Sequence, residues 1–159
     1  MGPKKGRRVI VLGAGFGGLE FCKKFSIEEA EIIVIDRQNH HLFQPLLYQV
    51  ASAGLSAPEI AQPIRQIFSG RMDISIVLDE VLAINLNERK VRLRESDSEL
   101  TYDYLINVLG AQTNYFGNDS WSVYSHGLKT LDDATRIRQA SFLHLRKQNM
   151  RAMILSENA

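Results

Sequence analysis

Several features that mark specialised proteins are scarce in this sequence of 159 residues. It contains one cysteine, Cys22, so it can form neither an internal disulfide nor a CxxC pair for metal or redox chemistry. Its 19 basic and 18 acidic side chains nearly cancel, and a net charge of +1 gives no reason to expect a nucleic-acid partner. No apolar run approaches the ~20 residues of a membrane-spanning helix. The basic start is not followed by the apolar h-region of a secretory signal. This favours an intracellular protein.

The first part of the chain predicts a βαβ unit. Residues 8–12 and 31–36 contain the aliphatic runs V-I-V-L and I-I-V-I, typical of strands that are buried on both faces of a sheet. Between them, apolar residues at helical spacing predict a helix over residues 17–28. Cys22 lies on the apolar face of this helix and is expected to be a buried small residue. Two strands joined by a helix imply a parallel sheet with a right-handed crossover.

The pattern changes after residue 38. Residues 39–57 indicate an ordered loop with a short helix, and residues 58–69 predict an amphipathic helix kinked at Pro63. Short alternating runs then predict a β-meander, followed by one more apolar strand and a long helix. The three meander strands, the later strand and the helix are expected at 73–77, 80–85, 90–94, 104–109 and 131–150.

The connection between the first strand and the first helix has the sequence G-A-G-F-G-G. Gly13, Gly15 and Gly18 satisfy G-x-G-x-x-G, in which the first glycine makes a tight turn and the third permits close helix packing. The second glycine lets a pyrophosphate approach the helix N-terminus. Asp36 ends the next strand at about the expected distance of ~20 residues and would accept hydrogen bonds from a ribose. The pattern indicates an adenine dinucleotide; a glycine-rich turn without a ligand is the alternative.

Longer phrases bear on the choice between NAD and FAD. They are D-R-Q-N-H-H-L-F-Q-P-L-L-Y-Q-V-A (36–51), A-G-L-S-A-P-E-I-A-Q-P-I-R (53–65), Y-D-Y-L-I-N-V-L-G-A (102–111) and T-N-Y-F-G-N-D-S-W (113–121). Together they resemble type II NADH dehydrogenase, the single-subunit NADH:quinone oxidoreductase, within the wider group of pyridine nucleotide-disulfide oxidoreductases. The resemblance covers roughly residues 7–138. It implies an α/β, Rossmann-like FAD-binding domain with a parallel sheet and an inserted β-meander, incomplete in this chain. The implied reaction moves a hydride from NADH to FAD and passes electrons on to a quinone.

The resemblance also implies which residues contact FAD. Asp36 and Arg37 would flank the adenosine ribose, and His41 would lie near the flavin-side path of the cofactor. His40 is expected to be a surface residue. The residues expected around the pyrophosphate are Gly13, Ala14, Gly15, Phe16, Gly17 and Gly18.

Two further contacts are implied in later segments. Val81, on the meander, would contact the adenine through its backbone. Gly110 corresponds to the glycine of a family turn written A-T-G-A, but Val108 and Leu109 replace the alanine and threonine, so this chain lacks the threonine hydroxyl there. No catalytic residue is assigned, and no metal site is expected because the histidines lack further ligands at suitable spacing.

The resemblance divides the chain into three parts. Residues 1–111 would be the N-terminal half of the FAD-binding domain, and residues 112–139 a connection and helix toward an NADH domain. Residues 140–159 depart from the family and are interpreted as an atypical tail, from a truncated or frame-shifted reading frame. The NADH domain, quinone pocket and C-terminal membrane-binding helices have no counterpart, so the chain is predicted to be inactive alone. The intact family member would be cytoplasmic and peripheral on the inner face of the cell membrane.

Two other functions remain open. One is another flavoprotein with two dinucleotide sites, such as a sulfide:quinone reductase, although such enzymes need redox cysteines near the flavin and this chain has only Cys22. The other is a non-catalytic nucleotide-binding module that a second chain completes.

Overall fold

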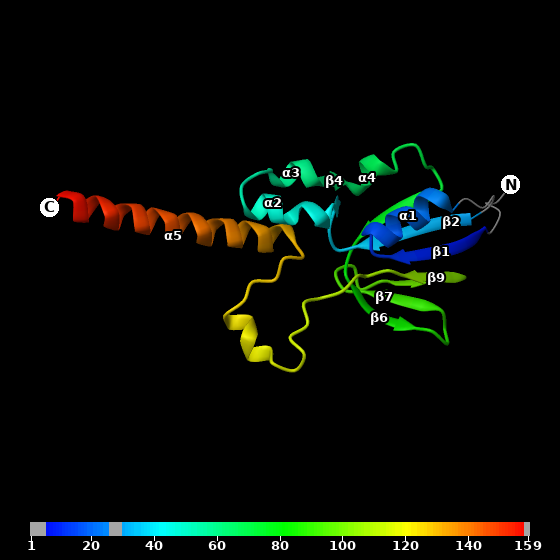
Figure 1. Ribbon diagram of the computed structural model, residues 1–159. Coiled ribbons are helices and arrows are strands. Elements are labelled where there is room, and N and C mark those ends of the chain that lie inside the picture. Colours follow the sequence, from blue (N-terminus) through cyan, green and yellow to red (C-terminus); the bar gives the residue numbers. More distant parts are fainter. Residues whose placement is uncertain (1–5, 26–29, 158–159) are drawn as a thin grey trace. The chain divides into compact units, whose positions relative to one another are not determined.

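The computed structural model describes residues 6–25 and 30–157, and the chain divides into two compact units (Figure 1). The first unit comprises Met1–His41 and Gln62–Ala111. The second comprises Leu42–Ala61 and Gln112–Ala159. The chain therefore leaves the first unit once, returns to it, and leaves it again.

A four-stranded parallel sheet forms the centre of the first unit. Its strands are β1 (Arg7–Leu12), β2 (Ala30–Asp36), β5 (Ile74–Leu78) and β9 (Tyr104–Asn107), in the order β5-β2-β1-β9. The connection from β1 to β2 runs through α1 (Phe16–Lys24). Residues 26–28 of the predicted helix lie outside the described residues. The predicted βαβ unit and the parallel α/β sheet are confirmed.

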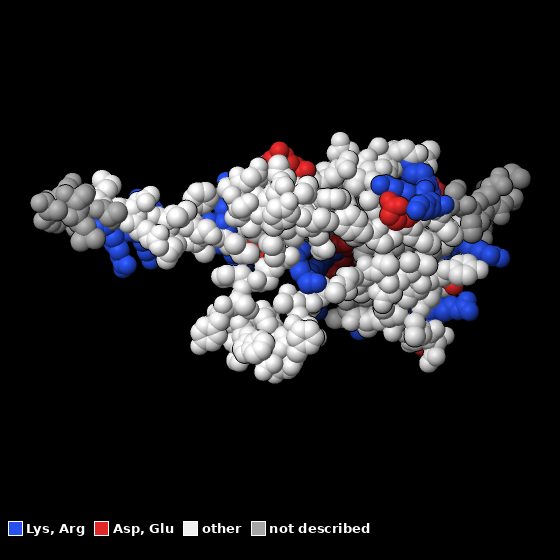
Figure 2. All heavy atoms as spheres, in the orientation of Figure 1, with Lys and Arg blue, Asp and Glu red and all other residues white. Residues whose placement is uncertain are grey.

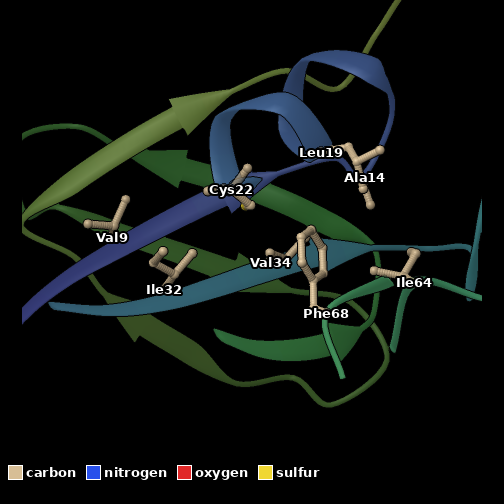
Figure 3. Packing of buried hydrophobic residues seen from close by; sticks show 9 residues of the cluster. Val9, Ala14, Leu19, Cys22, Ile32, Val34, Ile64 and Phe68 are labelled. Carbon is tan, nitrogen blue, oxygen red and sulfur yellow. The ribbon is translucent and has the colours of Figure 1, made fainter. Parts of the chain in front are cut away.

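Alternating residues of the central strands face two different cores. On one side Val9, Val11, Ile32 and Val34 pack with Leu19 and Cys22 of α1 and with Ile64 and Phe68 (Figure 3). On the other side lie the intervening residues of β1 and β2, which pack with Val91, Leu93 and Tyr102. This explains why both strands contain four aliphatic residues in a row, V-I-V-L in β1 and I-I-V-I in β2, because neither face of the sheet is left to water. The buried side chains of Val9, Val11, Ile10, Leu12, Ile32, Val34 and Ile35 are all at most 1% exposed.

An antiparallel meander covers the second face of the sheet. Its strands are β6 (Val81–Asn85), β7 (Lys90–Leu93) and β8 (Glu99–Thr101). The inserted meander is confirmed, but its membership differs from the prediction. The run predicted at 73–77 forms β5 and pairs in parallel with β2, and the third meander strand is β8. A period of two is the same in both kinds of strand, so the sequence pattern does not reveal the partner.

The buried carboxylate of Asp79 organises the ends of the meander. It accepts hydrogen bonds from the backbone N–H groups of Glu80, Glu95 and Ser96 and from the Ser96 hydroxyl, at 2.7–3.0 Å. These hydrogen bonds lower the pKa of Asp79 to about 2, and the bond from the N–H of Glu95 has the largest effect. The ionised carboxylate thus ties the segment before β6 to the loop between β7 and β8.

An arginine after α4 caps the C-terminal end of α1. Arg71 donates from Nη1 to the carbonyl of Cys22 and from Nη2 to that of Phe25, both at 3.0 Å. The same guanidinium binds the carboxylate of Asp73 at 2.6 and 2.7 Å. Hydrogen bonding from Arg71 lowers the pKa of Asp73. The cation satisfies carbonyls that a helix end leaves open.

The helix predicted over residues 58–69 is wrong. That segment forms α3 (Ala57–Ile60), β4 (Ala61–Pro63) and α4 (Ile64–Ile67), and β4 pairs with β3 (His40–Leu42). Pro63 has ψ of 128° and lacks an N–H, and the residue before a proline avoids the helical region. The proline therefore interrupts the helix with extended backbone instead of kinking it.

The second unit is helical. It contains η1 (Gln44–Leu46), α2 (Leu47–Ala51), α3, η2 (Asp119–Val123) and α5 (Leu131–Glu157). Leu47, Val50 and Ile60 pack against Ala134 of α5. The long helix extends beyond the predicted end at residue 150, and Lys and Arg side chains project along it (Figure 2). Within the described residues, no helix is both long and apolar enough to cross a membrane.

Candidate functional site

The turn between β1 and α1 requires glycine at two positions for reasons internal to the protein. Gly13 has φ of +99°, and its N–H donates to the carbonyl of Ile35 at 2.8 Å. A Cβ on Gly13 would lie 2.6 Å from the carbonyl oxygen of Val108. A Cβ on Gly18 would overlap the carbonyl oxygen of Gly13. Both glycines therefore let the start of α1 pack tightly against the ends of β1 and β9.

Gly15 differs from these two glycines. Its φ of −69° suits any residue, and no atom outside its chain neighbours lies within 4 Å of a Cβ placed on it. The protein itself gives no reason for glycine at this position. Open space beside the backbone at the start of a helix is what a closely approaching ligand needs.

The N-terminus of α1 suits an anion. Gly15 is its N-cap, no side chain caps it, and its first turn contains no acidic residue. Its last turn carries Lys23 and Lys24. The first N–H groups of a helix and its dipole both favour negative charge, so a phosphate fits this end.

Asp36 lies at the end of β2, beside the same turn. Its Oδ2 accepts a hydrogen bond from the N–H of Ala14 at 2.7 Å, and its Oδ1 accepts one from the N–H of Gln38 at 2.8 Å. Each carboxylate oxygen can accept a further hydrogen bond, so the group can still receive a pair of hydroxyls. Arg37 is exposed. The structure thus brings the predicted acidic residue to the predicted turn, 22 residues apart along the chain.

His41 contacts the same turn. It is 8% exposed, its Nδ1 is 3.0 Å from the carbonyl oxygen of Ala14, and its ring meets that of Phe16 edge-on at 5.1 Å. The sequence predicted it near the flavin-side path; the structure places it in contact with the turn that would bind the pyrophosphate. His40 is half-buried.

Val108, after β9, forms part of the turn's wall. Its Cγ1 would lie 3.1 Å from a Cβ on Gly17, so its side chain as well as its carbonyl faces the glycines. Sequence reasoning registered Val108 only as a departure from the family pattern and missed this role. Gly110 follows with φ of +82°, a conformation that favours glycine.

Val81, predicted to meet adenine, opens β6. The register of β6 against β7 shifts between Val81 and Ala83, and such irregularities re-aim backbone groups beside binding sites. Among the described residues, no group of three or more His, Cys, Asp or Glu side chains could hold a metal ion.

Comparison with known proteins agrees with this geometry. The family model for pyridine nucleotide-disulphide oxidoreductases matches residues 7–149. A type II NADH:quinone oxidoreductase of Mycobacterium tuberculosis is 41% identical over 133 residues, which are 82% of this chain and 28% of that protein. The chain therefore spans under a third of the length of this relative.

Solved structures show the same fold. NDH2 from Plasmodium falciparum in complex with NADH superposes with a TM-score of 0.76 at 27% identity, over 85% of this chain and 28% of that one. The sulfide:quinone oxidoreductase of Aquifex aeolicus gives a TM-score of 0.76 at 20% identity, over 92% of this chain and 32% of that one. The resemblance to type II NADH dehydrogenases, predicted from the sequence phrases, is confirmed. The chain belongs to the pyridine nucleotide-disulphide oxidoreductase family.

Proposed function

We propose that the turn at residues 13–18 binds the pyrophosphate of FAD, and that the chain is the FAD-binding part of an NADH:quinone oxidoreductase. The observation that carries the proposal is the open space at Gly15, where a glycine that the fold does not need stands at an uncapped helix N-terminus. The identity to type II NADH:quinone oxidoreductases supports FAD as the dinucleotide.

Each part of the site has a distinct task in binding. The backbone N–H groups at the start of α1 would receive the phosphates, and Asp36 would accept hydrogen bonds from the adenosine ribose. Because Asp36 is an acceptor fixed by two backbone donors, it disfavours a 2′-phosphate. Arg37 beside the ribose, Val81 at the adenine and Gly110 after β9 complete the proposed contacts. Bound FAD would supply the hydride and electron transfer that no side chain can perform.

The substrates belong to the longer protein. The named relatives are NADH:quinone oxidoreductases, and this chain spans 28–30% of their length. NADH as the hydride donor, a quinone as the acceptor and a peripheral position on the cytoplasmic face of the membrane are therefore proposed for the complete enzyme. The site at residues 13–18 would contribute to it by holding FAD.

A sulfide:quinone reductase is the second candidate, favoured by the fold comparison alone. That chemistry needs reactive thiols. Cys22 lies on α1 and is fully buried in the core between this helix and the sheet. Burial raises its pKa to about 11, so it is not a thiolate at neutral pH. This chain supplies no redox cysteine for such a reaction.

A titration of the purified chain with FAD tests the proposal. We expect saturable quenching of flavin fluorescence, lost in Gly15→Val and strongly weakened in Asp36→Ala. Gly70→Val is the matched control, because a Cβ on Gly70 also meets nothing within 4 Å but lies far along the chain from the turn. The same titration with NADH in place of FAD shows which of the two dinucleotides the turn binds. Absence of FAD binding by the wild-type protein, or wild-type affinity in Gly15→Val, would refute the proposal.

A further inference from the structure

The peptide groups of Ala14 are held from both directions by side chains. Its N–H donates to Oδ2 of Asp36 at 2.7 Å, and its carbonyl oxygen lies 3.0 Å from Nδ1 of His41. The preceding N–H, of Gly13, is also used, in a bond to the carbonyl of Ile35. The backbone N–H groups of the first two residues of the turn are thus hydrogen-bonded within the protein. A phosphate must therefore accept hydrogen bonds from the N–H groups of the residues that follow.

The contact between His41 and Ala14 determines which ring nitrogen of the imidazole donates a hydrogen bond. A carbonyl oxygen only accepts hydrogen bonds, so the Nδ1 atom must carry the proton that is donated. The ring is buried, and Phe16 abuts it edge-on at 5.1 Å with an interplanar angle of 85°. Phe16 is the first residue of α1, so His41 touches the turn at its second residue and again at the start of the helix.

We propose that His41 is a positioning residue for the dinucleotide turn, which it holds through the Ala14 carbonyl so that the first N–H groups of α1 converge on one phosphate. This inference rests on the proposed function of the turn. The bond from the N–H of Ala14 to Asp36 ties the same residue, through its preceding peptide group, to the residue that would bind the ribose. Ala14 is therefore the link through which the ribose side and the phosphate side of the site keep a common geometry. A turn already fixed in its bound shape binds more tightly because less order is imposed on binding.

Two variants of His41 separate its hydrogen bond from its ring. His41→Phe keeps an aromatic ring against Phe16 but has no donor. His41→Asn places an amide N–H where Nδ1 stood, bonded like it to Cγ, and has no ring. We expect FAD to bind about three- to tenfold more weakly to His41→Phe, the range for one neutral hydrogen bond, and His41→Asn to restore most of the loss. His40→Phe is the neighbouring control and should leave FAD affinity unchanged.

Nitrogen-15 NMR of the chain without FAD gives a second readout. We expect the His41 imidazole to carry its proton on Nδ1, and the amide signals of the turn to shift in His41→Phe but return toward wild type in His41→Asn. Equal FAD affinity in His41→Phe and wild type, or a proton found on Nε2 instead, would overturn the inference. If wild-type protein does not bind FAD, the proposed function fails, and the NMR readouts still decide whether His41 holds the turn.

Discussion

Substituting alanine at two glycines of one turn should separate folding from binding. A Cβ on Gly18 would overlap the carbonyl oxygen of Gly13. The N–H of Gly13 is hydrogen-bonded to β2, so the overlap cannot be relieved without moving a central strand. Overpacking of this kind costs about 3 kcal/mol. Alanine regains about 1 kcal/mol through its higher helix propensity, which leaves a net loss of about 2 kcal/mol for Gly18→Ala.

Gly15→Ala has no such cost. The backbone at Gly15 suits alanine, and its Cβ meets nothing within 4 Å, so we expect the free energy of unfolding to change by less than about 1 kcal/mol. A net loss of about 2 kcal/mol lowers the melting temperature of a chain of this size by about 4–8 °C. Gly18→Ala should show that shift and Gly15→Ala should not.

Urea denaturation followed by circular dichroism is the direct assay, with melting temperature as a second measure. FAD affinity of the two folded variants completes the comparison, since Gly15→Ala should weaken binding without loss of stability. A wild-type melting temperature in Gly18→Ala, or a loss above about 1 kcal/mol in Gly15→Ala, would show that the packing argument for the turn is wrong.

Three further outcomes are expected elsewhere in the first unit. The pKa of Asp79 is about 2, below its ordinary 3.8, so the stabilising effect of its carboxylate is complete above pH ~4 and is lost as pH falls toward 2. The urea midpoint of the wild-type protein should therefore drop over that range, and the midpoint of Asp79→Asn should drop less. Arg71→Met should cost about 1–3 kcal/mol of stability in urea unfolding, because it removes charged hydrogen bonds to α1 and to Asp73, whereas exposed Arg65→Met should cost little. Cys22, buried and with its pKa raised to about 11, should react with Ellman's reagent at pH 8 only after unfolding; rapid reaction of native protein would contradict its burial.

The local parts of the site could be predicted from the sequence. Continuous aliphatic strands, a G-x-G-x-x-G turn and Asp36 at the end of the next strand are features of one short βαβ segment, and local pattern determines them. The structure joins Asp36 to the turn through a direct bond to Ala14. The ordinary structural role of Cys22 also followed from its place on the apolar face of the helix.

The remainder depended on pairings between distant segments. The run I-S-I-V-L suits a meander strand as well as a parallel edge strand, and only the neighbouring β2 decides that it is β5. The bond from His41 to Ala14 crosses 27 residues, and the packing of Val108 on the glycines crosses about 90, so neither has a local signature. At Pro63 a local rule was available, but its outcome, a strand instead of a kink, required the partner β3.

The position of β1 in the sheet has a consequence for synthesis of the chain. β1 leaves the ribosome before one of its two neighbours, β9, because Val9 lies opposite Tyr104, 95 residues later. At about 5–20 residues per second, some 5–20 s pass between the two. During that interval the backbone of β1 has an unpaired side and an aliphatic surface that other nascent chains can bind. Chaperone dependence in the cell is therefore expected to be set by how soon β9 emerges.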